Sequence, residues 1–132
     1  MMERIRTIDV ADAIRARISE ALAVECTAGT TPTEFSFRSV HVTRVGGHRR
    51  DLVTDVATVS IDCRHLTSEV GADELSRDVD AVVHAAEGTM LGETSCYDVT
   101  TLAGPYQNPD PTNPALYRVS ASYQVAVRMS TT

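Results

Sequence analysis

The sequence has 132 residues, of which 42% are hydrophobic and 23% charged, and a net charge of −6. This length fits a single domain of common size, and the composition is that of a folded chain rather than a disordered one. The acidic balance argues against binding driven by nucleic-acid phosphates. No run approaches the 18 apolar residues needed to cross a bilayer, so we expect no membrane partner.

The N-terminus, the cysteines and the basic residues restrict the location of the protein and the kinds of site that it can carry. The start, Met1-Met2-Glu3-Arg4, lacks the apolar core of a signal peptide, which predicts a protein made in the cytoplasm. Cys26, Cys63 and Cys96 are odd in number and widely spaced, so we expect free thiols rather than a disulfide framework. All twelve basic residues are Arg, which excludes a phosphate-loop Lys, a Schiff-base Lys and a Lys general base.

The N-terminal third predicts a helix followed by a loop. Apolar residues recur at three- and four-residue steps from Ile8 to Val24, as on the buried face of a helix. The run Thr27–Thr33 consists of helix breakers and small polar residues and indicates a loop.

A β-hairpin is predicted next. Its first strand spans Phe35–Val45, with a slip in the apolar alternation between Phe37 and Val40 that indicates a bulge. The turn is placed at Gly46–Asp51, and Leu52 opens the second strand. That strand has one buried face, formed by Ala57, Val59, Ile61 and Cys63.

The second half contains a helix and two more strands. The helix is expected from Ser68 or Ala72 to Glu87, before a capping Gly88, on an apolar stripe of Leu75, Val79, Val82, Val83 and Ala86. A weaker strand follows at Thr94–Leu102, and then a loop from Ala103 to Pro114 that holds four of the five prolines. Strict alternation over Tyr117–Met129 predicts an unusually long final strand.

The predicted order is therefore α-β-β-α-β-β, in one domain covering residues 1–132. Two helices can cover one face of a four-stranded, mainly antiparallel sheet, which gives a two-layer α+β sandwich.

Catalytic motifs are not found, so we expect no enzyme activity, no cofactor and no metal. The best metal candidates are Cys63 and His65, because residues two apart on a strand point the same way. The favoured interpretation is that Cys63 continues the buried row and His65 lies in solvent at the strand end.

Two segments are candidate contact surfaces between subunits or with neighbouring proteins. His48, Arg49, Arg50 and Asp51 concentrate charge at the predicted hairpin tip, where guanidiniums could bind carboxylates of another chain. In the proline-rich loop the candidates are Tyr106, Pro109, Asp110 and Pro111, since a stiff loop loses less entropy on docking. An ordinary exposed turn and a plain long connection remain the alternatives.

The chain resembles the small tail-terminator proteins of siphophages, especially those infecting actinobacteria, and is similar to the lambda-type tail terminator. The likeness is carried by Thr43–Asp55, the following strand Ala57–Cys63, Asn108–Pro111, and Leu116–Arg118 at the start of the terminal strand. It spans nearly the whole chain, and its motifs are structural rather than catalytic.

This resemblance implies a structural protein of the virion tail, at the head-proximal end, with no active site. It implies a homo-oligomeric ring, expected to be a hexamer, that binds the tail tube protein, stops tail polymerisation and docks the head–tail connector protein. DNA would pass through the acidic ring without specific binding. Another phage neck, head-closure or tail-completion protein is an alternative, as is a small host enzyme or ligand-binding domain, which would need a pocket with convergent polar groups.

Overall fold

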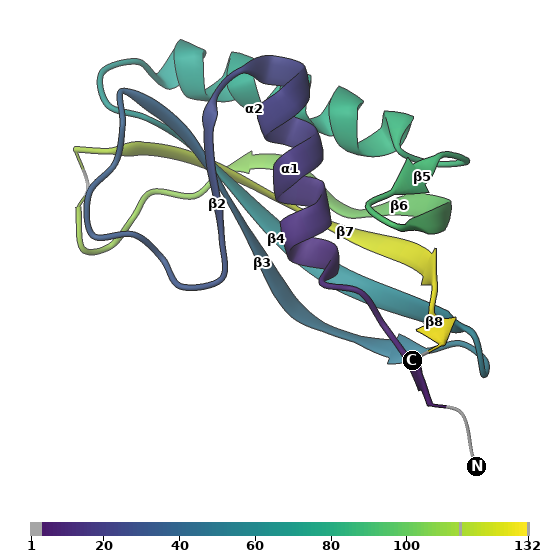
Figure 1. Ribbon diagram of the computed structural model, residues 1–132. Coiled ribbons are helices and arrows are strands. Elements are labelled where there is room, and N and C mark those ends of the chain that lie inside the picture. Colours follow the sequence, from purple (N-terminus) through teal and green to yellow (C-terminus); the bar gives the residue numbers. More distant parts are fainter. Residues whose placement is uncertain (1–3, 114, 132) are drawn as a thin grey trace.

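The computed structural model describes residues 4–113 and 115–131, and Figure 1 shows two helices lying over a curved sheet. Within that part of the chain the main sheet has six strands in the order β2-β3-β4-β7-β6-β5. Its strands are β2 (Glu25–Ala28), β3 (Arg38–Arg49), β4 (Thr54–His65), β5 (Met90–Leu91), β6 (Thr94–Gln107) and β7 (Tyr117–Arg128). Near the chain ends, β1 (Ile5–Arg6) pairs with β8 (Ser130–Thr131) in a separate small sheet.

The predicted four-stranded, mainly antiparallel sheet is wrong, because the sheet has six strands, is mixed and curls into a half-barrel. β2 runs parallel to β3, whereas the other neighbours are antiparallel. Part of β2 falls in the run Thr27–Thr33 that predicts a loop, and four residues are too few to show alternation. Its hydrogen-bonding partner, Ser39–Val42, lies beyond that loop, so local sequence does not reveal the strand.

Each helix begins at a side-chain cap. The carboxylate of Asp9 accepts a hydrogen bond from the backbone N–H of Asp12 at 3.0 Å and starts α1 (Val10–Leu22). The hydroxyl of Ser68 accepts one from the N–H of Gly71 at 2.9 Å and starts α2 (Glu69–Ala85). Both helices were expected from periodicity, and their caps place the ends within about three residues of the predicted bounds.

The core lies between the helices and one face of the sheet. Apolar side chains of both helices form a single buried cluster with the alternate residues of β3, β4 and β7. The members from these elements are Val10, Ala11, Ile14, Ile18, Leu75, Val79, Val83, Val40, Val42, Ala57, Val59, Ile61, Cys63, Ala121, Tyr123, Val125 and Val127. Because side chains alternate across a strand, the residues between them on β4 and β7 lie on the opposite face, and these are mostly polar apart from Val56 and Ala126.

The turn and the loop that flank these strands differ from their predicted positions. Gly46 and Gly47 continue β3, so the hairpin turn is Arg50–Val53 instead of Gly46–Asp51, and the bulge lies at Val45. The long loop predicted from Ala103 is shorter, because β6 continues through Pro105 to Gln107. Its last proline, Pro114, lies outside the described residues, as do Met1, Met2 and Glu3 at the start.

Neither helix in the described part of the chain is long and apolar enough to span a bilayer.

Candidate assembly surfaces

The β3–β4 hairpin is anchored close to its turn by a buried carboxylate. Asp55 on β4 accepts two hydrogen bonds from the guanidinium of Arg44 on β3, at 2.7 and 2.9 Å, and another from the hydroxyl of Thr7. Burial raises the pKa of Asp55, but the bonds from Arg44 and Thr7 outweigh that effect and leave its pKa below the ordinary value. These bonds join the two strands of the hairpin to each other and to the segment before α1.

The candidate residues at the hairpin tip, His48, Arg49, Arg50 and Asp51, are all exposed. The guanidinium of Arg49 donates to the carbonyl oxygen of Ile5 at 3.3 Å, and that of Arg50 pairs with Asp98 at 3.3 Å. Asp51 accepts a hydrogen bond from the N–H of Val53, which lowers the pKa of its carboxyl. These contacts are long or local, so the basic side chains remain available at the surface.

The four candidates in the proline-rich segment are in different surroundings. Tyr106 lies on β6, opposite Ser120, with its side chain half exposed, and Pro109 and Pro111 are exposed in the following turn. Asp110 faces inward instead. Its carboxylate, 14% exposed, accepts from the N–H and hydroxyl of Thr112 and lies 3.8 Å from Arg118.

The structure keeps the two candidate segments apart. When the strand pairing is followed across β4 and β7, Arg49 is in line with Cys96 at the start of β6. Tyr106 is near the other end of that strand. Figure 1 accordingly shows the hairpin tip and the loop before β7 at opposite ends of the sheet. A ring contact through one segment therefore leaves the other free for a different neighbour.

A buried arginine that the sequence does not single out lies on the face away from the helices. Arg64 is 2% exposed, and its guanidinium lies 4.6 Å from the centre of the Phe35 ring and 3.6 Å from the carboxylate of Asp62. Its Nε and Nη1 atoms have no hydrogen-bond partner among the described residues. Burial lowers the pKa of this guanidinium. The signal missed in the sequence is an arginine next to the last residue of a strand, on the face opposite Cys63.

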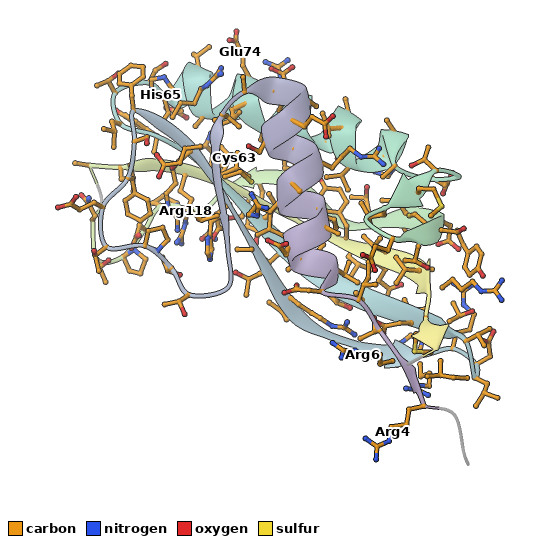
Figure 2. All side chains as sticks on the ribbon, viewed as in Figure 1. Arg4, Arg6, Cys63, His65, Glu74 and Arg118 are labelled. Carbon is orange, nitrogen blue, oxygen red and sulfur yellow. The ribbon has the colours of Figure 1, made fainter. Side chains whose placement is uncertain are left out.

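Cys63 and His65 have separate structural roles. Cys63 is in the core, where burial raises the pKa of its thiol well above the ordinary value. His65 is buried too, contrary to the prediction that it lies in solvent, and its Nδ1 accepts from the N–H groups of Thr67 and Ser68 at 3.2 and 3.0 Å. Figure 2 shows both residues toward the end of the sheet where α2 begins. No group of three or more potential metal ligands occurs in residues 4–113 and 115–131.

A groove of about 890 Å³ lies between α1 and the turn that follows β5. The carboxylates of Asp12, Glu20 and Glu93 line it together with Arg17. The guanidinium of Arg17 already donates to the carbonyl oxygen of Met90 at 2.5 Å and to the hydroxyl of Thr89 at 3.0 Å. With Asp9 also in the lining, carboxylates predominate among the charged groups of this groove.

Comparison with solved structures gives a match over nearly the full length of the chain. The similarity is to a chain of the "Virion of native gene transfer agent (GTA) particle", with a TM-score of 0.58 and 11% identity, covering 90% of this chain and 91% of that chain. The fold resembles that of a virion component. At this identity the likeness concerns the fold alone. No family model matches the sequence, and no curated protein matches it either.

Proposed function

We propose that this chain is a structural protein of a phage or phage-like virion. The observation that carries the proposal is the fold similarity to a gene transfer agent virion chain, which extends over 90% of this chain and 91% of the other. A match limited to a common substructure would cover only part of each chain. The surface agrees with an assembly role, since charge is concentrated at an exposed hairpin tip.

Within that class we propose the role of tail terminator. The resemblance in sequence points to this role, and the anchored hairpin supports it, because the Arg44–Asp55 pair holds the Arg49 and Arg50 side chains on a rigid support. In this role the chain forms a homo-oligomeric ring, expected to be a hexamer, at the head-proximal end of the tail. One face binds the tail tube protein and the other docks the head–tail connector protein.

The proposed ring is a non-enzymatic passage for DNA. A net charge of −6 makes each subunit repel the phosphate backbone, so DNA passes through the lumen without being held. A basic lumen in the assembled ring would contradict this part of the proposal.

Deletion of the gene tests the tail-terminator role, with negative-stain microscopy of the particles that form. We expect overlong tails, or tails without heads, because nothing would stop polymerisation or present a docking face. Complementation with the wild-type gene is the control and should restore tails of normal length on full particles.

Two other outcomes discriminate the alternatives. Full heads that leak DNA beside tails of normal length would identify a head-closure or other neck protein. Intact virions with normal tails would overturn the structural role and direct attention to a host enzyme or binding domain.

A further inference from the structure

Each edge of the main sheet is covered along only part of its length. On one side β2 pairs with β3 at Ser39–Val42, and no strand in the described residues pairs with the outer side of β3 over residues 43–49. On the other side β5 pairs with β6 at Thr94 and Ser95, and the backbone of Cys96 exchanges hydrogen bonds with Gly88 and Thr89. Among the described residues no strand pairs with the outer side of residues 97–107, where the N–H of Val99 donates to the carboxylate of Glu87 at 3.0 Å. An uncovered strand edge presents N–H and C=O groups that can pair with another chain.

The two open stretches lie at the same level of the sheet. Following the pairing from strand to strand, Thr43 on β3 is in line with Ser60, Ser122 and Ala103 on β6. At the other limit, His48 on β3 is in line with Val56, Ala126 and Asp98 on β6. The open part of β3 therefore matches residues 98–103 of β6 in position and in length.

The strand directions also match. β3, β4, β7 and β6 follow one another through three antiparallel pairings, so β3 and β6 run in opposite directions. A second copy in the same orientation would bring its β6 edge antiparallel to the β3 edge of the first. Antiparallel strand pairing is slightly more stable per residue than parallel pairing.

The side chains at the two edges are complementary. Each open stretch has a bulge that carries one exposed aliphatic side chain, Val45 on β3 (60% exposed) and Leu102 on β6 (50% exposed). Arg44, beside the first bulge, is in line with Thr101, beside the second. In the same alignment His48 of one copy faces Asp98 of the other, whose carboxylate lies 3.3 Å from Arg50 of its own chain.

We propose that copies of this chain join head to tail by pairing residues 43–48 of β3 with residues 98–103 of β6 in the next copy. The two edges are different surfaces, so the contact is heterologous and closes into a ring when the rotation between copies permits. The inference rests on the proposed function, which requires a ring, and it identifies the strands that form the contact between subunits.

Disulfide cross-linking in assembled particles tests this contact. A Val45→Cys, Leu102→Cys double variant, in a Cys26→Ser background that removes the partly exposed natural thiol, should give a ladder of covalent oligomers after mild oxidation. Either single variant should give no covalent oligomers. A Val45→Cys, Val70→Cys double variant is the matched control, because Val70 is 66% exposed but lies on α2, and it should give no ladder.

A second variant tests the edge without new thiols. Leu102→Lys places a charge at the β6 edge, which opposes pairing, and should reproduce the overlong tails of the deletion while the purified subunit keeps its wild-type thermal midpoint. Val70→Lys makes the same chemical change on α2 and should leave tails normal.

The outcomes separate the two proposals. Particles that contain the chain but give no ladder with the Val45–Leu102 variant would overturn the edge contact and leave the proposed function standing. Particles that lack the chain would overturn the proposed function and, with it, this contact.

Discussion

Asp55 shows how one carboxylate can position a surface that lies several residues away. It is buried between β3 and β4 and accepts hydrogen bonds from Arg44 and Thr7. Through these bonds it connects the hairpin, which carries Arg49 and Arg50, to the segment that precedes α1. On its other side the hairpin is supported by β7, which pairs with β4 as far as Thr54.

Asp55→Asn should therefore destabilise the protein by about 2 kcal/mol, because charge-assisted hydrogen bonds contribute more than neutral ones and Arg44 would lose its counter-charge. Urea denaturation followed by circular dichroism measures the change. Asp51→Asn, at an exposed site on the same hairpin, is the control and should leave the midpoint nearly unmoved. Equal effects of the two variants would mean that the buried pair does not stabilise the hairpin.

The same carboxylate predicts a pH dependence. Its folded-state pKa lies below the ordinary value of 3.8, so its contribution is complete above that value and declines as the pH falls through the lower folded-state pKa. The stability difference between wild type and Asp55→Asn should be constant near neutral pH and shrink below about pH 4. Urea midpoints of both proteins between pH 6 and pH 3 test this, and a difference that grows on acidification would contradict it.

For Arg64, unlike Asp55, we expect removal of the buried charge to change the stability little. Two of its nitrogens lack partners among the described residues, and its contact with Asp62 is long, at 3.6 Å. Arg64→Met should change the stability by less than about 1 kcal/mol, since an apolar side chain of similar length removes the desolvation cost together with the pair. Asp62→Ala should cost more, about 3 kcal/mol, because it removes the carboxylate that lies 3.6 Å from the buried guanidinium.

Urea denaturation of the two variants compares these costs. Ser120→Ala serves as the control, because Ser120 donates a hydrogen bond to Asp62 but carries no charge. A larger loss for Arg64→Met than for Asp62→Ala would show that the guanidinium stabilises the fold.

At the scale of the elements, the β3–β4 hairpin depends on one close approach of backbone to backbone. Gly47 has a φ of +130°, and a Cβ at this position would lie 2.2 Å from the carbonyl oxygen of Val56. No neighbouring side chain can move to relieve that overlap, because the atom in contact is main chain. Gly47, the second member of the glycine pair that predicts a turn in the sequence, therefore serves instead to let β3 lie close against β4.

Gly47→Ala should destabilise the protein by about 3 kcal/mol, as expected for a strained backbone combined with a steric overlap. Gly104→Ala is the matched control, because Gly104 is also in a long strand but a Cβ there would have nothing within 4 Å. Thermal unfolding compares the two variants. Similar midpoints would mean that the hairpin adjusts and that the close approach is not required.

The elements also show where sequence periodicity succeeds and where it does not. The stripe from Leu75 to Val83 and the alternation over Tyr117–Met129 extend over enough residues to predict α2 and β7 within about three residues of their bounds. β2 and β5 contain only four and two residues, and neither is long enough to display a period. Pro105, which predicts a loop, lies where β6 has no outer neighbour, so its missing N–H costs no hydrogen bond on that side.

For the whole molecule, the exposed arginines allow a test of assembly that leaves the fold intact. Replacing both Arg49 and Arg50 by Ala should change the free energy of unfolding by less than about 0.5 kcal/mol, because each makes one 3.3 Å contact at the surface. The double variant should nevertheless reduce incorporation of the chain into particles, since planar guanidiniums at a rigid tip are suited to carboxylates of a neighbouring subunit.

Quantitative immunoblotting of purified particles measures this incorporation. Arg77→Ala, an exposed arginine on α2, is the control and should be incorporated normally. Loss of folded structure in the double variant would mean that the hairpin tip is part of the core support, and normal incorporation would remove it from the candidate contacts.

The sequence by itself determined the α+β class, the two helices and the long strands, because repeated burial of one face leaves a period of 3.6 or 2 along the chain. It also placed charge at the hairpin tip, where the structure leaves those side chains exposed. Only the tertiary structure decided that six strands join in one curved, mixed sheet, that Asp110 turns inward and Arg64 is buried, and that β3 and β6 keep open edges at the same level. These features depend on pairings between residues far apart in the chain, and a local period records which face is buried but not which strand lies beside it.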